Sequence, residues 1–178
     1  MCRGVKVTPK QKTLIVELID LLPESEKEIY QEITNYLIEL GYIPQKQNVK
    51  NFILAFKHKE NGKVIAKVGA RKREGFVSIK FFACKNVPDK YVSALRSEIE
   101  SHNGQYCGPV RSDIVKNACG QCNSCTGGGI GYYYVYPDGK EVLRCGAYPI
   151  LIPGISLDDM VEMKRLILEQ HYYFLSIA

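Results

Sequence analysis

The stretch from Phe52 to Phe82, FILAFKHKENGKVIAKVGARKREGFVSIKFF, decides the fold of this chain. Three runs rich in Val, Ile and Phe are separated by Asn61-Gly62 and by a charged turn at 72–75. Asn and Gly both accept a positive φ, so Asn61-Gly62 is a strong signal for a hairpin between two strands. Runs of this composition between such turns are typical of neighbouring antiparallel strands. The stretch therefore predicts an antiparallel β-meander with strands at 52–57, 64–68 and 76–82.

Helical periodicity predicts two helices before the meander and two after it. Thr8-Pro9 is typical of an N-cap followed by proline at the first helical position, and Ser25 is a candidate cap for the second helix. Gly41 is a natural residue for the end of that helix. The polar residues 42–51 are expected to be a connector. The later helices are expected at about 88–100 and, capped by Ser156, through about 174.

A hairpin and one short strand are predicted between the two later helices. Residues 131–136 are tyrosine-rich, and Pro137-Asp138-Gly139 is a turn in which proline fixes φ and glycine supplies the left-handed residue. Residues 140–145 return as the second strand, and 148–152 form a short apolar strand. The chain is therefore expected to be α+β: N-terminal helices, an antiparallel β-meander, an inserted Cys/Gly-rich loop and hairpin, and a C-terminal helix packed on the sheet.

Composition places the chain among globular proteins. Hydrophobic residues make up 46% of its 178 residues, which is enough for a core at this length. No window approaches the roughly 20 apolar residues of a membrane span, and residues 1–6 lack the apolar core of a signal peptide. We therefore expect a cytosolic protein, with no membrane partner, that forms a single domain over residues 1–178. This domain has a helical preface at 8–41 and a Cys/Gly-rich loop at 107–131.

The segment from Cys107 to Cys145 holds five of the seven cysteines. In a reducing compartment, clustered cysteines are more often metal ligands or redox thiols than disulfides. Cys-x-x-Cys spacing lets two thiolates face one cation, and the predicted hairpin carries Cys145 back towards the end of the loop near Gly131. The sequence therefore predicts a metal site made by Cys119, Cys122, Cys125 and Cys145, with Cys107 as a substitute for Cys125. Cys84, at the end of the third strand, is instead expected to be a small buried hydrophobe.

Three interpretations of the cysteine cluster stay open. Four thiolates close the tetrahedron that structural zinc prefers, and we favour this reading. The triple spacing is also typical of an iron–sulfur cluster, although the nearby fourth cysteine followed by proline is absent. The third interpretation is a set of metal-free thiols, redox-active or inert. Catalysis by a cysteine nucleophile would need a histidine close by, and His58, His102 and His171 have no recognisable partner motif.

Basic residues along the meander indicate a different kind of function. The net charge is +5, and the cations on or beside the predicted strands are Lys57, Lys59, Lys63, Lys67, Arg71, Lys72, Arg73 and Lys80. Proteins that bind single-stranded nucleic acid use basic faces with interleaved aromatic side chains. Lysines on the wet face of a sheet also deter aggregation, which is the commoner reason for such a pattern. Contact with nucleic acid is therefore an alternative, not the leading expectation.

The segments 40–42, 52–56, 63–70 and 76–84 resemble a group of small, uncharacterised bacterial α+β proteins. The most distinctive matches are the run from Cys119 to Cys125 and the later Cys145-Gly146. Residues 148–174 also resemble the end of the small YdhG-like domains, so the similarity extends over about 25–175. The resemblance implies an α+β domain and a metal site, and it implies no established activity.

The expected function is that of a cytosolic protein with a chiefly structural zinc ion in its Cys-rich loop. The zinc would pin the glycine-rich insertion to the hairpin, beside which an unidentified small molecule or protein partner would bind. One alternative is a thiol or iron–sulfur redox protein. A second alternative is a nucleic-acid-associated accessory protein. The sequence identifies no catalytic residue.

Overall fold

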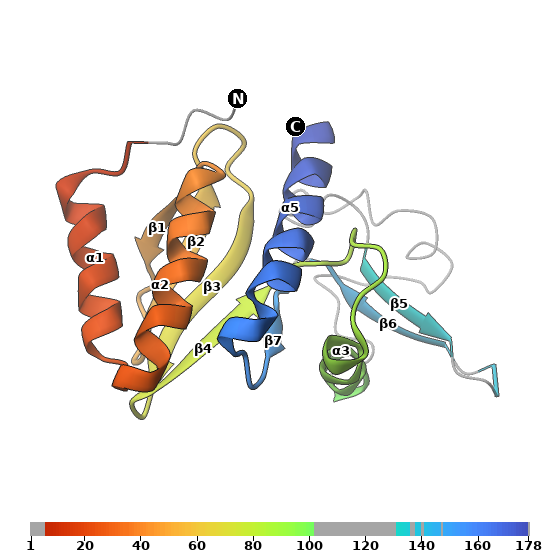
Figure 1. Ribbon diagram of the computed structural model, residues 1–178. Helices are drawn as coiled ribbons and strands as arrows, with labels where there is room; N and C mark the ends of the chain where they lie inside the picture. Colours follow the sequence, from red (N-terminus) through yellow and green to blue (C-terminus); the bar gives the residue numbers. More distant parts are fainter. Residues whose placement is uncertain (1–5, 102–130, 136–137, 140, 147, 178) are drawn as a thin grey trace.

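In this computed structural model, the described residues are 6–101, 131–135, 138–139, 141–146 and 148–177, and they form an α+β fold (Figure 1). Within them, five strands form an antiparallel sheet in the order β1-β2-β3-β4-β7. The strands are β1 (Tyr42–Lys46), β2 (Phe52–His58), β3 (Val64–Arg71), β4 (Glu74–Ile79) and β7 (Ile150–Ile152). The predicted meander is therefore confirmed, with β7 added beside β4 from a distant part of the sequence.

Helices α1 (Pro9–Asp20), α2 (Glu24–Glu39) and α5 (Met160–Ser176) cover one face of this sheet (Figure 1). An ion pair between Lys164 and Glu32, with a distance of 2.7 Å, joins α5 to α2. Helix α3 (Asp89–Ser101) contacts β7 at the edge of the sheet. The expectation that the C-terminal helix packs on the sheet is confirmed.

The core lies between the sheet and these helices. Cross-strand rows of buried side chains face the helices, because residues alternate between the two faces of a strand. The rows are Leu54, Val68, Val77 and Ile152, and then Phe56, Ala66, Ile79 and Ile150. Leu18, Ile33, Leu37, Ile167 and Phe174 complete the core from the helices. Each large apolar side chain that is fully buried contributes roughly 2 kcal/mol, which favours this arrangement of layers.

Local sequence signals explain several element ends. Thr8 and Gln11 form a capping box at the start of α1, in which each side chain bonds the backbone amide of the other residue. Gly41 has a φ of 93° just after α2, and Gly62 has a φ of 71° in the β2–β3 hairpin. Both glycines were expected at these turns, because a residue without Cβ adopts such a φ at the lowest steric cost.

Three sequence predictions about local structure are wrong. Residues 42–46 are not part of a connector but form the edge strand β1, which pairs with β2 from Tyr42 opposite His58 to Lys46 opposite Leu54. Ser25 does not cap α2, because the helix already begins at Glu24 after Pro23. Lys80 does not lie on the wet face of the sheet. Its side chain is 1% exposed, and its Nζ lies 6.0 Å from the centre of the Phe174 ring.

Two further elements complete the described fold. Ser156 precedes a short 3-10 helix, η1 (Leu157–Asp159), that leads into α5, and the Asp159 carboxylate accepts hydrogen bonds from the amide and hydroxyl of Ser156. Strands β5 (Gly131–Val135) and β6 (Glu141–Cys145) form a separate antiparallel hairpin. None of the helices in the described ranges is both long and apolar enough to cross a lipid bilayer.

Candidate functional site

Cys145 is the member of the predicted cysteine site that falls within the described residues. It is the last residue of β6 and pairs in register with Gly131, the first residue of β5. The other candidates, Cys107, Cys119, Cys122 and Cys125, lie outside the described residues. The predicted hairpin is confirmed, and it carries Cys145 back to the point where the chain leaves the Cys/Gly-rich segment.

This pairing limits how far Cys145 can lie from the cysteine run. Paired Cα atoms in an antiparallel ladder are about 5 Å apart. Cys125 precedes Gly131 by six residues, and a chain of six residues spans about 20 Å at most. This length of chain allows Cys125 to reach Cys145, which a metal site shared by both residues requires.

Tyr132 anchors the hairpin to the rest of the fold. Its side chain is 3% exposed, and its hydroxyl oxygen accepts a hydrogen bond of 3.2 Å from the backbone amide of Phe81. Its ring also makes edge-to-face contacts with Phe81 and Phe82, with ring centres 5.7 and 5.8 Å apart. Edge-to-face pairs of aromatic rings are favourable because the ring edge is positive and the ring face is negative. Strand β5 is thus fixed at Tyr132 to the chain that follows β4.

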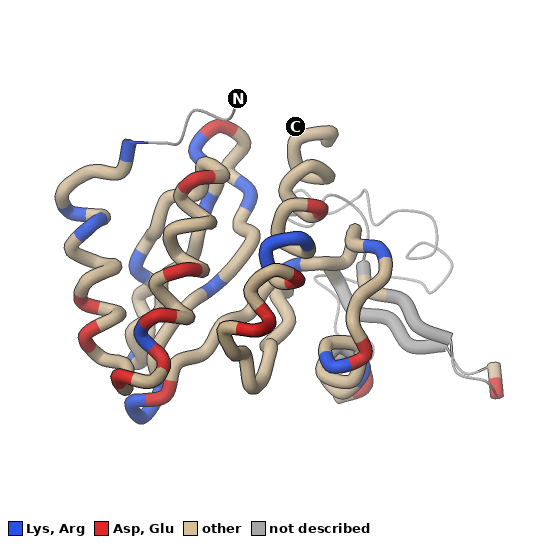
Figure 2. The backbone as a smooth tube through the Cα atoms, in the orientation of Figure 1, with Lys and Arg blue, Asp and Glu red and all other residues tan. Residues whose placement is uncertain are grey.

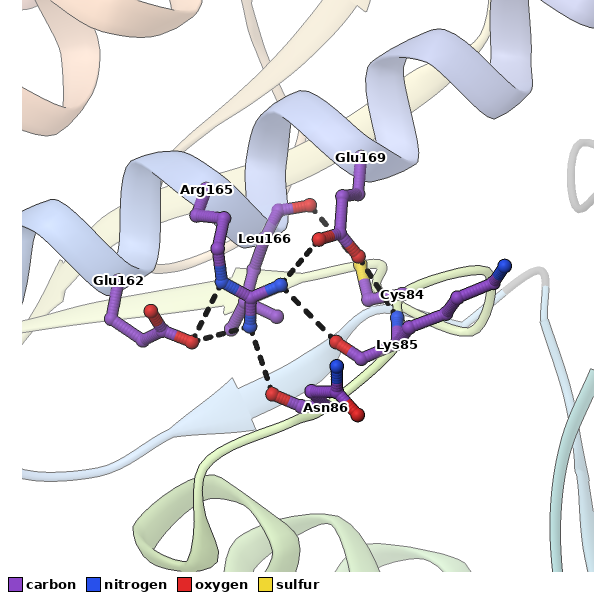
Figure 3. Close-up of polar contacts among 7 residues, drawn as sticks. All are labelled: Cys84, Lys85, Asn86, Glu162, Arg165, Leu166 and Glu169. Atoms are coloured by element: carbon purple, nitrogen blue, oxygen red, sulfur yellow. Dashed lines mark hydrogen bonds and ion pairs between the residues drawn. The ribbon is translucent and has the colours of Figure 1, made fainter.

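Cys84 lies in that same connecting segment but has the character of a core residue. Its thiol donates a hydrogen bond of 3.1 Å to the carbonyl oxygen of Leu166 on α5 (Figure 3). Burial, together with the nearby negative charge of Glu169, raises the pKa of this thiol to about 12. A thiol that stays protonated at neutral pH is a poor nucleophile and a poor metal ligand. Cys84 was expected to be a small buried hydrophobe; it is a partly buried residue that packs against the core.

Arg165 holds the turn that contains Cys84 against α5. Its guanidinium donates to the carboxylates of Glu162 and Glu169, and to the backbone carbonyls of Lys85 at 3.2 Å and Asn86 at 2.9 Å (Figure 3). The Lys85 amide donates in turn to Glu169 at 2.9 Å. A planar fork of donors is what allows one side chain to bind two carboxylates and two carbonyls. The turn therefore has a defined position where the chain leaves the sheet towards α3.

Two histidines that are far apart in the sequence lie close together inside the fold. His58 at the end of β2 is 7% exposed, His171 on α5 is 2% exposed, and their ring centres are 5.6 Å apart. His171 Nδ1 lies 3.3 Å from the hydroxyl of the buried Tyr42. Burial first, and the neighbouring His58 second, lower the pKa of His171. Burial therefore favours the neutral imidazole of His171. Sequence reasoning missed this pair of histidines because the two residues come from distant elements.

A hollow of about 640 Å³ opens beside β4. It exists because β7 pairs only with Val77–Ile79, so the first half of β4 lacks a neighbour on that side within the described part of the chain. Cations, the carboxylate-bearing residue Glu74, a hydroxyl and aromatic rings line it together, which is a mixed chemistry suited to a polar ligand with a flat apolar part. The residues concerned include Tyr30, Arg71, Lys72, Phe76, Ser78 and Leu151.

The described side chains do not by themselves form a metal site, since no group of three or more His, Cys, Asp or Glu residues among them is placed to hold an ion. In comparisons with known proteins, no family model, curated protein or solved structure matches this chain. The resemblance to small bacterial α+β proteins therefore stays a prediction.

Proposed function

We propose that this chain is a metal-binding protein in which Cys119, Cys122, Cys125 and Cys145 hold a structural zinc ion. The observation that carries the proposal is the β5–β6 register, in which Cys145 lies opposite Gly131. Four thiolates satisfy the tetrahedral preference of zinc without a water ligand, which is typical of structural sites. Cys107 is the substitute ligand if Cys125 is not used.

In this proposal the ion ties the segment 107–131 to the hairpin that Tyr132 anchors. The free energy of zinc binding then becomes folding free energy for that segment. A loop tied by the ion to a fixed hairpin presents a defined surface to a small molecule or a protein partner. The role proposed for the protein is therefore binding and not catalysis, in a reducing compartment where the thiolates persist.

Cys84 provides the matched control for testing this site. Cys122→Ser and Cys145→Ser each remove one proposed ligand, whereas Cys84→Ser keeps a donor for the Leu166 carbonyl. The chain is purified without oxygen, and its metal content is measured together with its thermal unfolding. We expect one zinc per chain in the wild type and in Cys84→Ser, and loss of zinc with a lower unfolding temperature in the other two variants.

The same measurement separates the alternatives. If the purified protein is brown and contains iron, the same cysteines hold an iron–sulfur cluster and not zinc. A metal-free wild type whose unfolding is unchanged by Cys122→Ser would contradict any metal site. In that case, free thiols would remain as the interpretation of the cysteine run.

A further inference from the structure

Positive charge is concentrated in the part of the chain that forms β1 to β4. Residues 42–80 contain ten lysines and arginines and two glutamates, although the whole chain has a net charge of only +5. Helix α2 has the opposite character, with five glutamates and one lysine. Figure 2 shows this separation, with Lys and Arg along the strands and Asp and Glu on α2. The sheet layer is therefore basic and the helix layer over it is acidic.

The basic side chains extend to the sheet face opposite α1, α2 and α5, which we call the open face. Lys57, Lys67 and Arg71 lie on it because each alternates with a core residue that faces the helices. By the same alternation and register, the open face includes Ile43, Gln45, Ile53, Ala55, Lys57, Lys67, Gly69, Arg71, Phe76, Ser78 and Leu151. Lys67, Ser78 and Leu151 form one cross-strand row, and Leu151 is 42% exposed.

Phe76 forms a flat aromatic surface on the open face. Its ring lies over Gly69, where a Cβ would come within 2.7 Å of the ring atoms, so the absence of a side chain at Gly69 lets the ring lie close to the sheet. The guanidinium of Arg71 lies 5.9 Å from the ring centre. Phe76 and Arg71 also line the hollow beside β4, together with Lys72 and Ser78. An aromatic ring, cations and a cavity thus meet at one end of the open face.

We infer that the open face binds single-stranded nucleic acid. The cations would neutralise phosphates along β3, and a base would stack on Phe76 at the entrance of the hollow, which has room for a base. Proteins that bind single strands combine these elements, a basic track and an aromatic ring on which a base stacks. A duplex is less suitable because its bases are already stacked. A membrane surface is less suitable because Ile43, Ile53 and Phe76 are partly buried.

The inference is tested by measuring how a labelled oligothymidylate of about 15 nucleotides binds as the salt concentration rises from about 50 mM. Four phosphate contacts, from Lys57, Lys67, Arg71 and Lys72, predict a slope of about −3 for log K against log salt. The double variant Lys67→Ala/Arg71→Ala should reduce the slope to about −1.5. Phe76→Leu, which still covers Gly69, should weaken binding about fivefold or more with little change in slope.

The control double variant, Lys10→Ala/Lys12→Ala, removes the same charge from exposed positions on α1. It should bind as the wild type does if the open face is the site. The inference is overturned if the control weakens binding as much as Lys67→Ala/Arg71→Ala, or if a duplex of equal length binds equally well. It is also overturned if the protein binds vesicles of phosphatidylglycerol but not the oligonucleotide. Cys122→Ser should leave oligonucleotide binding unchanged, which separates this test from that of the zinc site.

Discussion

The hydrogen bond from the Phe81 amide to the Tyr132 hydroxyl links the β5–β6 hairpin to the chain that follows the main sheet. The contribution of this bond to stability can be tested by substitution. Tyr132→Phe removes the hydroxyl and keeps the ring contacts with Phe81 and Phe82. The Phe81 amide, in a residue that is 2% exposed, would then lose its acceptor. A buried donor that loses its partner costs about 2 kcal/mol. For a chain of this size, such a loss lowers the unfolding temperature by about 4–8 °C.

The assay combines thermal unfolding with hydrogen exchange at the Phe81 amide. Tyr172→Phe is the matched control, because Tyr172 is 58% exposed and should change stability by less than about 0.5 kcal/mol. We expect Tyr132→Phe to unfold at a lower temperature than the control and to exchange the Phe81 amide faster. Equal unfolding temperatures and unchanged protection of this amide would refute the proposal that Tyr132 anchors the hairpin.

Three further predictions concern the packing and the charges of the fold. In Gly75→Ala the new Cβ would lie 2.4 Å from Tyr30 ring atoms, so overpacking should lower the free energy of unfolding, measured in urea, by about 1–3 kcal/mol. If this variant is as stable as the wild type, the close approach of Tyr30 to Gly75 is contradicted. Folding lowers the pKa of His171 below its ordinary value of about 6.5. The stability that the neutral His171 contributes is therefore complete above about pH 6.5, and it is lost as the pH falls through the pKa of His171 in the folded protein. His171→Gln should therefore lose less stability than the wild type between about pH 7.5 and 5.5, and equal losses would refute this reasoning. Arg165→Lys keeps the charge but not the fork of donors, so the free energy of unfolding should fall by roughly 1 kcal/mol. Hydrogen exchange at the Lys85 amide should also become faster. An unchanged rate of exchange at this amide would show that the Arg165 side chain does not hold the turn.

Some predictions succeeded because they depend on interactions between residues close in sequence. The capping box at Thr8 joins residues three positions apart, and the Asn61-Gly62 turn joins adjacent strands. The pairing of Gly131 with Cys145 follows from one turn between two strands of similar length. These features require only backbone preferences and short-range hydrogen bonds.

Other features depend on partners that are distant in the sequence. Residues 42–46 include Pro44, Gln45 and Lys46, which do not favour a strand, yet they form β1, and Tyr42 is buried against His171, 129 residues away. The burial of Lys80 beside Phe174 also depends on where α5 lies. The hollow beside β4 exists because the short β7 comes from the far end of the chain. No local pattern encodes these contacts.

The sequence alone determined the helices, the meander, the hairpin and a set of candidate cysteine ligands, because periodicity, turns and residue spacing act over short stretches of chain. Tertiary structure decided which sheet face the helices cover, that His58 and His171 are buried together, and that the Cys84 thiol donates a hydrogen bond to a backbone carbonyl of α5. These outcomes depend on burial, and burial is set by the packing of whole elements and not by the residues next to each position.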